Sequence, residues 1–318
     1  MTVFYLFLFV LGFLLLHLSA EWLIKGVGEV ARFLGWREFV ISFFVMAVAA
    51  SLPNLFLAII SALNNIPELS LGDVIGGNVI DLTLGVALAV LLTKEEVKIE
   101  SRVVQKSALF TCLVAIFPFL LIVDGKLSRA DGLLLWLIFL IYNFWLLSKK
   151  ELPKKEETKT EGSPIKEIFN FFKATKKIGW GMVFCFLAAW VVVICVKFFS
   201  AHFKIPFILL GLLPVALGNS LPEIYFSIVS ARKKESWMFL GNLMGSVVGA
   251  TTFVLGTVAI LCPFDIQNKA QIFWGRIFLL LASLFFVLFL KTDAKLTKKE
   301  ALFLLVLYLL FLICESKL

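Results

Sequence analysis

The chain has 318 residues, of which 61% are hydrophobic, 14% are aromatic and only 16% are charged. Soluble domains carry roughly a quarter charged residues, so the composition excludes a soluble globular protein and indicates an integral membrane protein. The net charge of +8 does not indicate a nucleic-acid partner, because the basic residues lie between the apolar runs, where membrane topology uses them. The five cysteines show no paired spacing and predict neither a disulfide framework nor a zinc site.

The apolar runs predict about ten membrane-spanning helices, because a helix needs about 20 apolar residues to cross a bilayer. In chain order the runs lie near residues 3–24, 38–63, 71–93, 103–123, 130–148, 178–200, 205–231, 237–262, 271–290 and 300–315. The first run has no basic leader and continues directly into the segment Glu21 to Lys25. It is therefore expected to be a transmembrane helix rather than a signal peptide.

The loops between these runs differ in charge. One alternate set, which includes the Lys-rich stretch 149–177, holds roughly four times as many Lys and Arg residues as the other set. The positive-inside rule places the richer set in the cytoplasm and both chain termini outside the cell membrane.

Residues 149–177 form the one long hydrophilic segment and predict a cytoplasmic linker. A regulatory segment is the alternative, but low complexity favours a solvated tether. The linker separates a first transmembrane half, 1–148, from a second half, 178–318. An odd number of helices in each half predicts that the two halves are inverted relative to each other.

An internal repeat relates the two halves. Ser51-Leu52-Pro53-Asn54 returns 169 positions later as Ser220-Leu221-Pro222-Glu223. The same offset aligns further small and apolar residues over roughly thirty positions without a gap, which is typical of an internal structural repeat. The repeats fall within about 38–93 and 205–262.

Each repeat carries a proline in the middle of a span. Proline removes a backbone donor and clashes with the carbonyl one turn earlier, so Pro53 and Pro222 predict kinked or broken helices. Carbonyls freed at membrane depth must be buried in protein or face a hydrated cavity, and they are good ligands for Na⁺ and Ca²⁺. A packing kink is the alternative, but two equivalent prolines, followed by Asn54 and Glu223, favour an ion site.

Glu223 is the residue most indicative of function. A charge near the bilayer centre costs several kcal/mol, so such residues usually face a cavity and bind ions, protons or substrate. On a helix, Glu223 shares one face with Asn219 and Ser227 at four-residue spacing. This face is therefore predicted to contribute to the ion path.

A second polar stripe follows in each repeat. In the first repeat Asp73, Gly77 and Asp81 recur at four-residue spacing, and their partners in the second repeat are Asn242, Ser246 and Ala250. Asp81 lies within the membrane and is predicted to be functional. Asp73 lies near the outer end of its span, where an ion-path role and simple solvation are equally expected.

The histidines and the remaining sequence motifs do not indicate a metal site or a catalytic site. His17 and His202 have no carboxylate or cysteine at ligand spacing, so packing or interfacial roles are expected. The sequence contains no phosphate-binding loop, no nucleophile motif and no carboxylate pair arranged for hydrolysis. The chain is therefore not expected to be an enzyme, and no cofactor is expected.

The two repeats resemble those of the sodium/calcium exchanger superfamily of cation antiporters, in which each repeat reads Gly-Thr-Ser-Leu-Pro-Glu and then Gly-Asn-x-x-Gly-Ser-Asn. The second repeat reads Gly218-Asn219-Ser220-Leu221-Pro222-Glu223 and continues with Gly241 to Val247, while the first gives Ala49 to Asn54 and Gly72 to Asn78. The resemblance covers the whole chain. It implies a divergent, prokaryotic-type member with about ten helices in two inverted halves and proline-broken helices at the ion site.

In that family the Glu after each proline forms the central Ca²⁺ site, together with Thr and Ser oxygens and backbone carbonyls. This chain has Asn54 in place of one Glu, and Ala50 and Asn219 in place of the threonines. The resemblance and the polar stripes together give the expected ion ligands: Glu223, Asp81, Asn54, Ser51, Ser220, Asn219, Ser246, Asn242 and Asp73.

The resemblance implies a secondary active antiporter that exchanges Na⁺ for Ca²⁺ or a related cation by alternating access, with sliding of the peripheral helices near 3–24 and 178–200. Because Asn54 replaces a carboxylate, altered Ca²⁺ affinity or stoichiometry is expected. The expected partners are inorganic cations and membrane lipid, with the monomer as the functional unit. Two alternatives remain: a cation/H⁺ antiporter on the same fold, and a family member that has lost transport.

Overall fold

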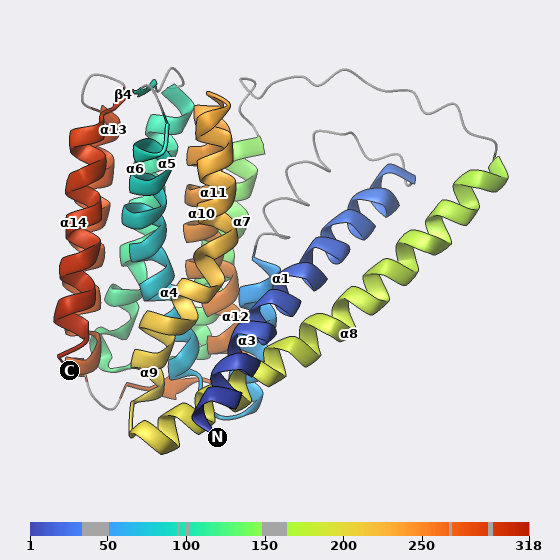
Figure 1. Ribbon diagram of the computed structural model, residues 1–318, viewed down its shortest axis with the longest axis horizontal. Helices are drawn as coiled ribbons and strands as arrows, with labels where there is room; N and C mark the ends of the chain where they lie inside the picture. Colours follow the sequence, from blue (N-terminus) through green and yellow to red (C-terminus); the bar gives the residue numbers. More distant parts are fainter. Residues whose placement is uncertain are drawn as a thin grey trace.

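The computed structural model describes residues 1–33, 51–93, 96–98, 102–147, 164–266, 269–291 and 295–317. The described chain is almost entirely helical (Figure 1), which confirms the all-α class. The helices are α1 (Thr2–Phe33), α3 (Leu52–Leu63), α4 (Glu68–Ile80), α5 (Val86–Leu91), α6 (Arg102–Leu121), α7 (Arg129–Leu147), α8 (Pro164–Phe203), α9 (Phe207–Leu210), α10 (Ala216–Arg232), α11 (Ser236–Val248), α12 (Leu255–Leu261), α13 (Phe273–Lys291) and α14 (Lys298–Glu315).

Within the described residues, seven helical stretches are long and apolar enough to cross a membrane. Three of them contain a π turn between two α-helices: η1 (Asp81–Gly85) joins α4 to α5, η3 (Gly211–Val215) joins α9 to α10, and η4 (Gly249–Val254) joins α11 to α12. The part of the predicted second span at 38–50 lies outside the described residues. The chain is a multi-pass membrane protein.

Two short antiparallel strand pairs connect loops of the two halves. Strand β1 (Val97–Lys98) pairs with β4 (Lys295–Leu296), and β2 (Lys126–Leu127) pairs with β3 (Phe264–Asp265). Short 3₁₀ turns at Ile122–Asp124 and Lys269–Ile272 adjoin α6 and α13. These contacts tie the ends of helices from one half to those of the other.

The break predicted at the prolines is absent at Pro222, while the residues just before Ser51 lie outside the described residues. Helix α10 continues through Pro222, and Pro53 lies in the first turn of α3, where a backbone N–H has no intrahelical partner to lose. The departures from α geometry are the π turns instead. A π turn widens the helix and is frequent at functional sites, and η1 and η4 occupy equivalent places in the two repeats.

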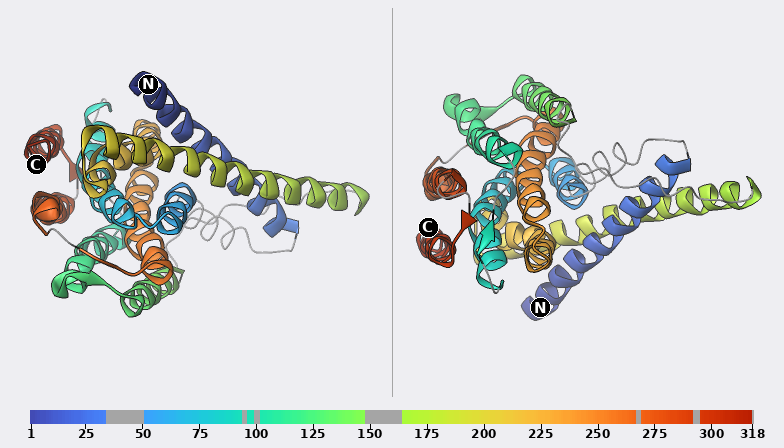
Figure 2. Two further views of the ribbon diagram at one scale, coloured as in Figure 1. Left: turned by 90° about the horizontal axis from the view of Figure 1, so that it is seen from below. Right: turned by 90° about the horizontal axis from the view of Figure 1, so that it is seen from above.

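Helix α8 also differs from the prediction. It begins at Pro164, so residues 164–177 of the predicted linker 149–177 are helical, while 149–163 lie outside the described residues. Proline at the first helical position favours such an early start. The extension lies beside α1, where Lys177 Nζ contacts Glu29 Oε1 at 2.6 Å. Helices α1 and α8 run side by side and project together from the remaining helices (Figures 1 and 2).

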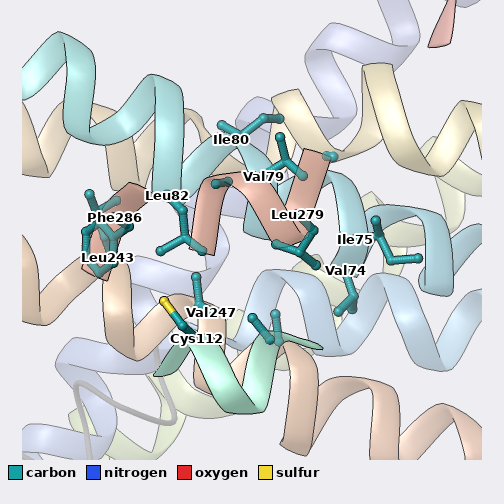
Figure 3. Close-up of a cluster of buried hydrophobic side chains, with 14 of the residues drawn as sticks. Val74, Ile75, Val79, Ile80, Leu82, Cys112, Leu243, Val247, Leu279 and Phe286 are labelled. Carbon is teal, nitrogen blue, oxygen red and sulfur yellow. The ribbon is translucent and has the colours of Figure 1, made fainter. Parts of the chain in front are cut away.

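Buried apolar side chains form two main clusters. The larger lies among α4, α6, α11 and α13 and includes Ile75, Leu243 and Phe286 (Figure 3). The second joins α1 and α8 to α3 and includes Leu16 and Val192. The α1–α8 pair therefore has its own packing surface against the rest of the molecule.

Glycines bring α4 into backbone contact with the segment α9–η3. A Cβ atom at Gly72 would overlap the carbonyl oxygen of Ile208, and one at Gly76 would overlap that of Leu212. Gly211 makes the reciprocal approach to the carbonyl of Leu69. Small residues allow this close packing in membranes, and it fixes the first-repeat helix α4 against the span that leads into α10.

Candidate functional site

Helix α10 carries the central polar face. Asn219, Glu223 and Ser227 are all buried, and their four-residue spacing places them on one side of the helix, as the sequence predicted. Ser220, the next residue after Asn219, is buried as well. The face is thus enclosed by protein rather than exposed to lipid, which is the environment that an intramembrane carboxylate requires.

Asp73 of α4 meets this face directly. The Nδ2 group of Asn219 donates to Asp73 Oδ1 at 3.0 Å and to Oδ2 at 2.9 Å. Asp73 is only 4% exposed, which argues against the solvated-end alternative. An amide that donates to both carboxylate oxygens holds Asp73 in a fixed position beside α10.

Asp81 is the first residue of η1 and is 2% exposed. Its carboxylate accepts hydrogen bonds from the hydroxyls of Ser220 on α10 and Ser246 on α11. The negative charge of Asp81 repels that of Glu223, and the negative charge of Asp73 repels it more weakly. The structure therefore brings together first-repeat and second-repeat residues that lie far apart in the sequence.

The remaining predicted ligands surround this centre. Asn242 of α11 donates from Nδ2 to the backbone carbonyl of Glu223 at 3.2 Å and to Ser227 Oγ at 3.4 Å. Ser51, the N-cap residue of α3, is buried and Asn54 on α3 is half-buried. Helix α3 packs against α4 and η4, which brings this segment of the first repeat next to two of the elements that carry the polar residues.

Several buried oxygen atoms on these helices accept no hydrogen bond from the residues that the structure describes. They are Asn54 Oδ1, Asn78 Oδ1, Asp81 Oδ1, Asn219 Oδ1 and Glu223 Oε2. Buried polar atoms are nearly always paired, and an unpaired one costs about 1–3 kcal/mol. All five are carbonyl or carboxylate oxygens, which are the ligands that hard cations such as Na⁺ and Ca²⁺ prefer.

The carboxylates do not form one compact cluster. Among the described residues, no three Asp, Glu, His or Cys side chains lie close enough to hold a metal ion together. A cation bound here would be coordinated by a carboxylate with amide, hydroxyl and backbone oxygens around it. Mixed oxygen sets of this kind suit Ca²⁺ and Na⁺ and do not suit Zn²⁺.

The sequence did not predict a place in the site for three residues of this region. Asn78 donates from Nδ2 to Thr251 Oγ1 at 2.7 Å, a buried contact between α4 and η4. Asn78 ends the first-repeat glycine motif, so its place in that motif was an available signal. His17 of α1, for which packing or an interfacial role was expected, lies 3.1 Å through Nε2 from the carbonyl oxygen of Gly218.

Comparison with known proteins identifies the family. Residues 4–148 and 172–316 match the sodium/calcium exchanger protein family. The chain belongs to this family. Its members are transporters rather than enzymes, and the match includes both stretches that carry the repeats.

Individual relatives agree with this membership. The inner membrane protein YrbG of Escherichia coli is 27% identical over 83% of this chain and 82% of its own length. The sodium/calcium exchanger MaX1 of Methanosarcina acetivorans is 24% identical over 95% of this chain and 96% of its own. A solved structure of the sodium-calcium exchanger NCX_Mj, soaked with Na⁺ and Sr²⁺, is 26% identical, covers 98% of this chain and 99% of its own, and gives a TM-score of 0.65.

Proposed function

We propose that this protein is a secondary active antiporter that exchanges Na⁺ for Ca²⁺ or a related cation. The observation that carries the proposal is a set of buried acceptor oxygens, Glu223 and Asp81 among them, that have no hydrogen-bond partner within the described part of the chain. Membership in the sodium/calcium exchanger family and the named activities of MaX1 and NCX_Mj support the choice of ions. Inorganic cations are then the substrates, and no resident cofactor is needed.

The charges of the site limit how many ions it holds. Glu223 and Asp81 each leave one carboxylate oxygen unpaired, whereas both oxygens of Asp73 accept from Asn219. With Asp73 proposed as a partner of Asn219 and not as an ion ligand, the two ligand charges of Glu223 and Asp81 balance one Ca²⁺ or two Na⁺. Three Na⁺ would exceed these two ligand charges in a poorly polarisable interior. The proposed exchange is therefore two Na⁺ for one Ca²⁺, without net charge movement.

Each remaining residue has a proposed role in this exchange. The hydroxyls of Ser220 and Ser246 orient the Asp81 carboxylate. Asn242 holds the backbone of Glu223 and the Ser227 hydroxyl in place. Ser51 and Asn54 of α3 contribute neutral oxygens from the first repeat, in place of a second glutamate.

Alternating access requires an element that moves across the site. The proposed element is the α1–α8 pair, because its two helices pack along each other and project from the rest of the molecule (Figure 1). In the proposed orientation both termini lie outside the cell membrane and the basic loops lie in the cytoplasm, following the charge asymmetry.

The proposal is tested with purified protein in liposomes loaded with Na⁺. Uptake of Ca²⁺ is measured against outward gradients of Na⁺, K⁺ and H⁺, with the membrane voltage set by a potassium ionophore. We expect Ca²⁺ uptake that requires internal Na⁺ and does not respond to voltage. Uptake driven by a pH gradient without Na⁺ would establish the cation/H⁺ alternative. Voltage-dependent uptake would contradict the two-to-one ratio, and no flux in any gradient would contradict transport itself.

A further inference from the structure

The backbone of α10 has one carbonyl that the helix itself cannot pair in the usual way. In an α-helix the carbonyl of residue 218 accepts from the N–H of residue 222, but Pro222 has no N–H to donate. Helix α10 nevertheless continues through Pro222. The Gly218 carbonyl therefore needs a donor from outside α10.

His17 of α1 supplies that donor. Its Nε2 lies 3.1 Å from Gly218 O. A carbonyl oxygen only accepts hydrogen bonds, so the contact requires the hydrogen on Nε2. The His17 ring is half-buried and lies beside Phe13, with ring centroids 6.4 Å apart and an interplanar angle of 27°.

Gly218 also sets how closely α1 approaches. A Cβ atom at this position would lie 2.8 Å from the ring of Phe13, so the glycine allows α1 to reach the α10 backbone. The next residue, Asn219, holds Asp73 through its amide. The contact from α1 thus ends one residue away from the polar face of the proposed ion site.

We propose that His17 is a positioning residue: its hydrogen bond to the Gly218 carbonyl holds α1 against the ion-binding helix in this conformation. The hydrogen bond breaks when the α1–α8 pair moves, and the freed carbonyl then takes another donor or water. The repeat offset places Phe186 of α8 in the position equivalent to His17, and phenylalanine cannot donate. The hydrogen bond from His17 to the Gly218 carbonyl, called the latch below, therefore favours one of the two access states over the other. This inference rests on the proposed antiport for its role in transport, but the latch itself is a property of the conformational equilibrium.

The test compares three variants that separate the donor from the bulk of the side chain. His17→Leu removes the donor, and His17→Gln places an amide N–H near the position of Nε2. His202→Leu is the matched control, because the chain has only two histidines and His202 is exposed and stacks on Phe198. Each variant is purified and checked for the elution volume and melting temperature of the wild type.

The conformational readout is a spin-label distance between α1 and α10. The labels are attached to cysteines that replace the exposed residues Leu14 and Tyr225, after Cys262 and Cys314 are replaced by serine. His17→Leu is expected to shift the ratio of the two distance populations by about tenfold, since the half-buried Gly218 carbonyl loses its donor. His17→Gln and His202→Leu are expected to stay within about twofold of wild type.

Transport gives the second readout. His17→Leu is expected to change the maximal exchange rate several-fold while the ion dissociation constant measured at equilibrium changes less than about twofold, because His17 does not touch the ions. Unchanged distance populations in His17→Leu would overturn the latch, as would His17→Gln behaving like His17→Leu. A shifted distance population in a protein that moves no ions would keep the latch and contradict the proposed antiport.

A measurement on the unmutated side chain completes the test and does not depend on variant folding. With ¹⁵N-labelled histidine, wild type and His202→Leu assign the two sets of imidazole signals. The hydrogen bond requires hydrogen on Nε2 of His17, which both the neutral Nε2–H tautomer and the imidazolium carry. An unprotonated Nε2 on His17 would overturn the latch.

Discussion

The two copies of the Ser-Leu-Pro segment have the same sequence pattern but different surroundings. In the second copy Glu223 is buried on a long helix that runs through its proline. In the first copy the proline lies at the start of α3 and is followed by the half-buried amide Asn54. The first repeat supplies its charge from Asp81 instead, at the start of a π turn. The two copies thus share a sequence motif, while the helix around the proline and the positions of the charges differ.

The glycine motifs of the two repeats also share a sequence pattern but have different neighbours. Gly72 and Gly76 of the first repeat lie against backbone carbonyls of α9 and η3, whereas their equivalents Gly241 and Gly245 meet no described atom within 4 Å of an added Cβ. The same residue type is therefore required for close packing in one copy and is free of that constraint, among the described residues, in the other.

The largest effects on transport are expected from changing the charge of the residue that follows each proline. Glu223→Gln removes one of two site charges and should reduce Na⁺-driven Ca²⁺ uptake more than about a hundredfold, since an intramembrane carboxylate is retained for ion binding. Asn54→Glu adds a carboxylate to the first copy. It should tighten Ca²⁺ binding about tenfold and make exchange voltage-dependent, because three negative charges accept a third Na⁺.

The measurement is flux in liposomes at set voltage, with the ion dissociation constant from calorimetry. The control is Glu68→Gln, which neutralises another acidic residue, in the first turn of α4. Unchanged flux in Glu223→Gln would remove this residue from the site, and voltage-independent exchange in Asn54→Glu would contradict the charge argument.

The second prediction concerns the two glycine motifs. Gly76→Ala forces a methyl group against the carbonyl of Leu212, and overpacking against backbone should reduce the free energy of unfolding by about 3 kcal/mol. Gly245→Ala has no such neighbour and should change stability by less than about 0.5 kcal/mol. Thermal unfolding in detergent compares the two. Equal losses would show that the packing difference between the repeats is not present in solution.

The third prediction concerns the intramembrane charge of the first repeat and the effect of placing it at the equivalent position of the second repeat. Asp81→Asn should weaken Ca²⁺ binding about tenfold, a smaller loss than Glu223→Gln, because the amide oxygen still accepts from Ser220 and Ser246. Ala250 holds the equivalent position and is buried. Adding Ala250→Asp to Asp81→Asn should restore part of the affinity. Calorimetry of both variants checks this, and a double variant weaker than Asp81→Asn would show that the two positions are not interchangeable.

The sequence predicted the features that depend on local composition and on the repeat. Of the ten spans predicted from apolar length, seven coincide with described helical stretches that are long and apolar enough to cross a membrane. The spacing of Asn219 and Glu223 predicted their common buried face. The sequence could not predict the hydrogen bonds between Asn219 and Asp73 or between His17 and Gly218. These contacts join residues that are 146 and 201 positions apart. Such contacts depend on how helices pack, and helical spacing reports only which residues share a face. The early start of α8 at Pro164 was not predicted because the spans were predicted from apolar runs, and residues 164–177 include several charged residues.

The smallest effect on transport is expected from removing the ion pair between α1 and α8. Glu29 and Lys177 form an ion pair of 2.6 Å, but their side chains are 33% and 35% exposed, and pairs of this kind contribute about 0.2–1 kcal/mol. A double-mutant cycle of Glu29→Gln and Lys177→Gln should therefore give a coupling energy below about 1 kcal/mol that decreases with added salt. Because the pair joins two helices proposed to move as one body, its loss should leave the exchange rate within about twofold of wild type. A much larger change in rate, without a matching change in stability, would mean that α1 and α8 move relative to each other during transport.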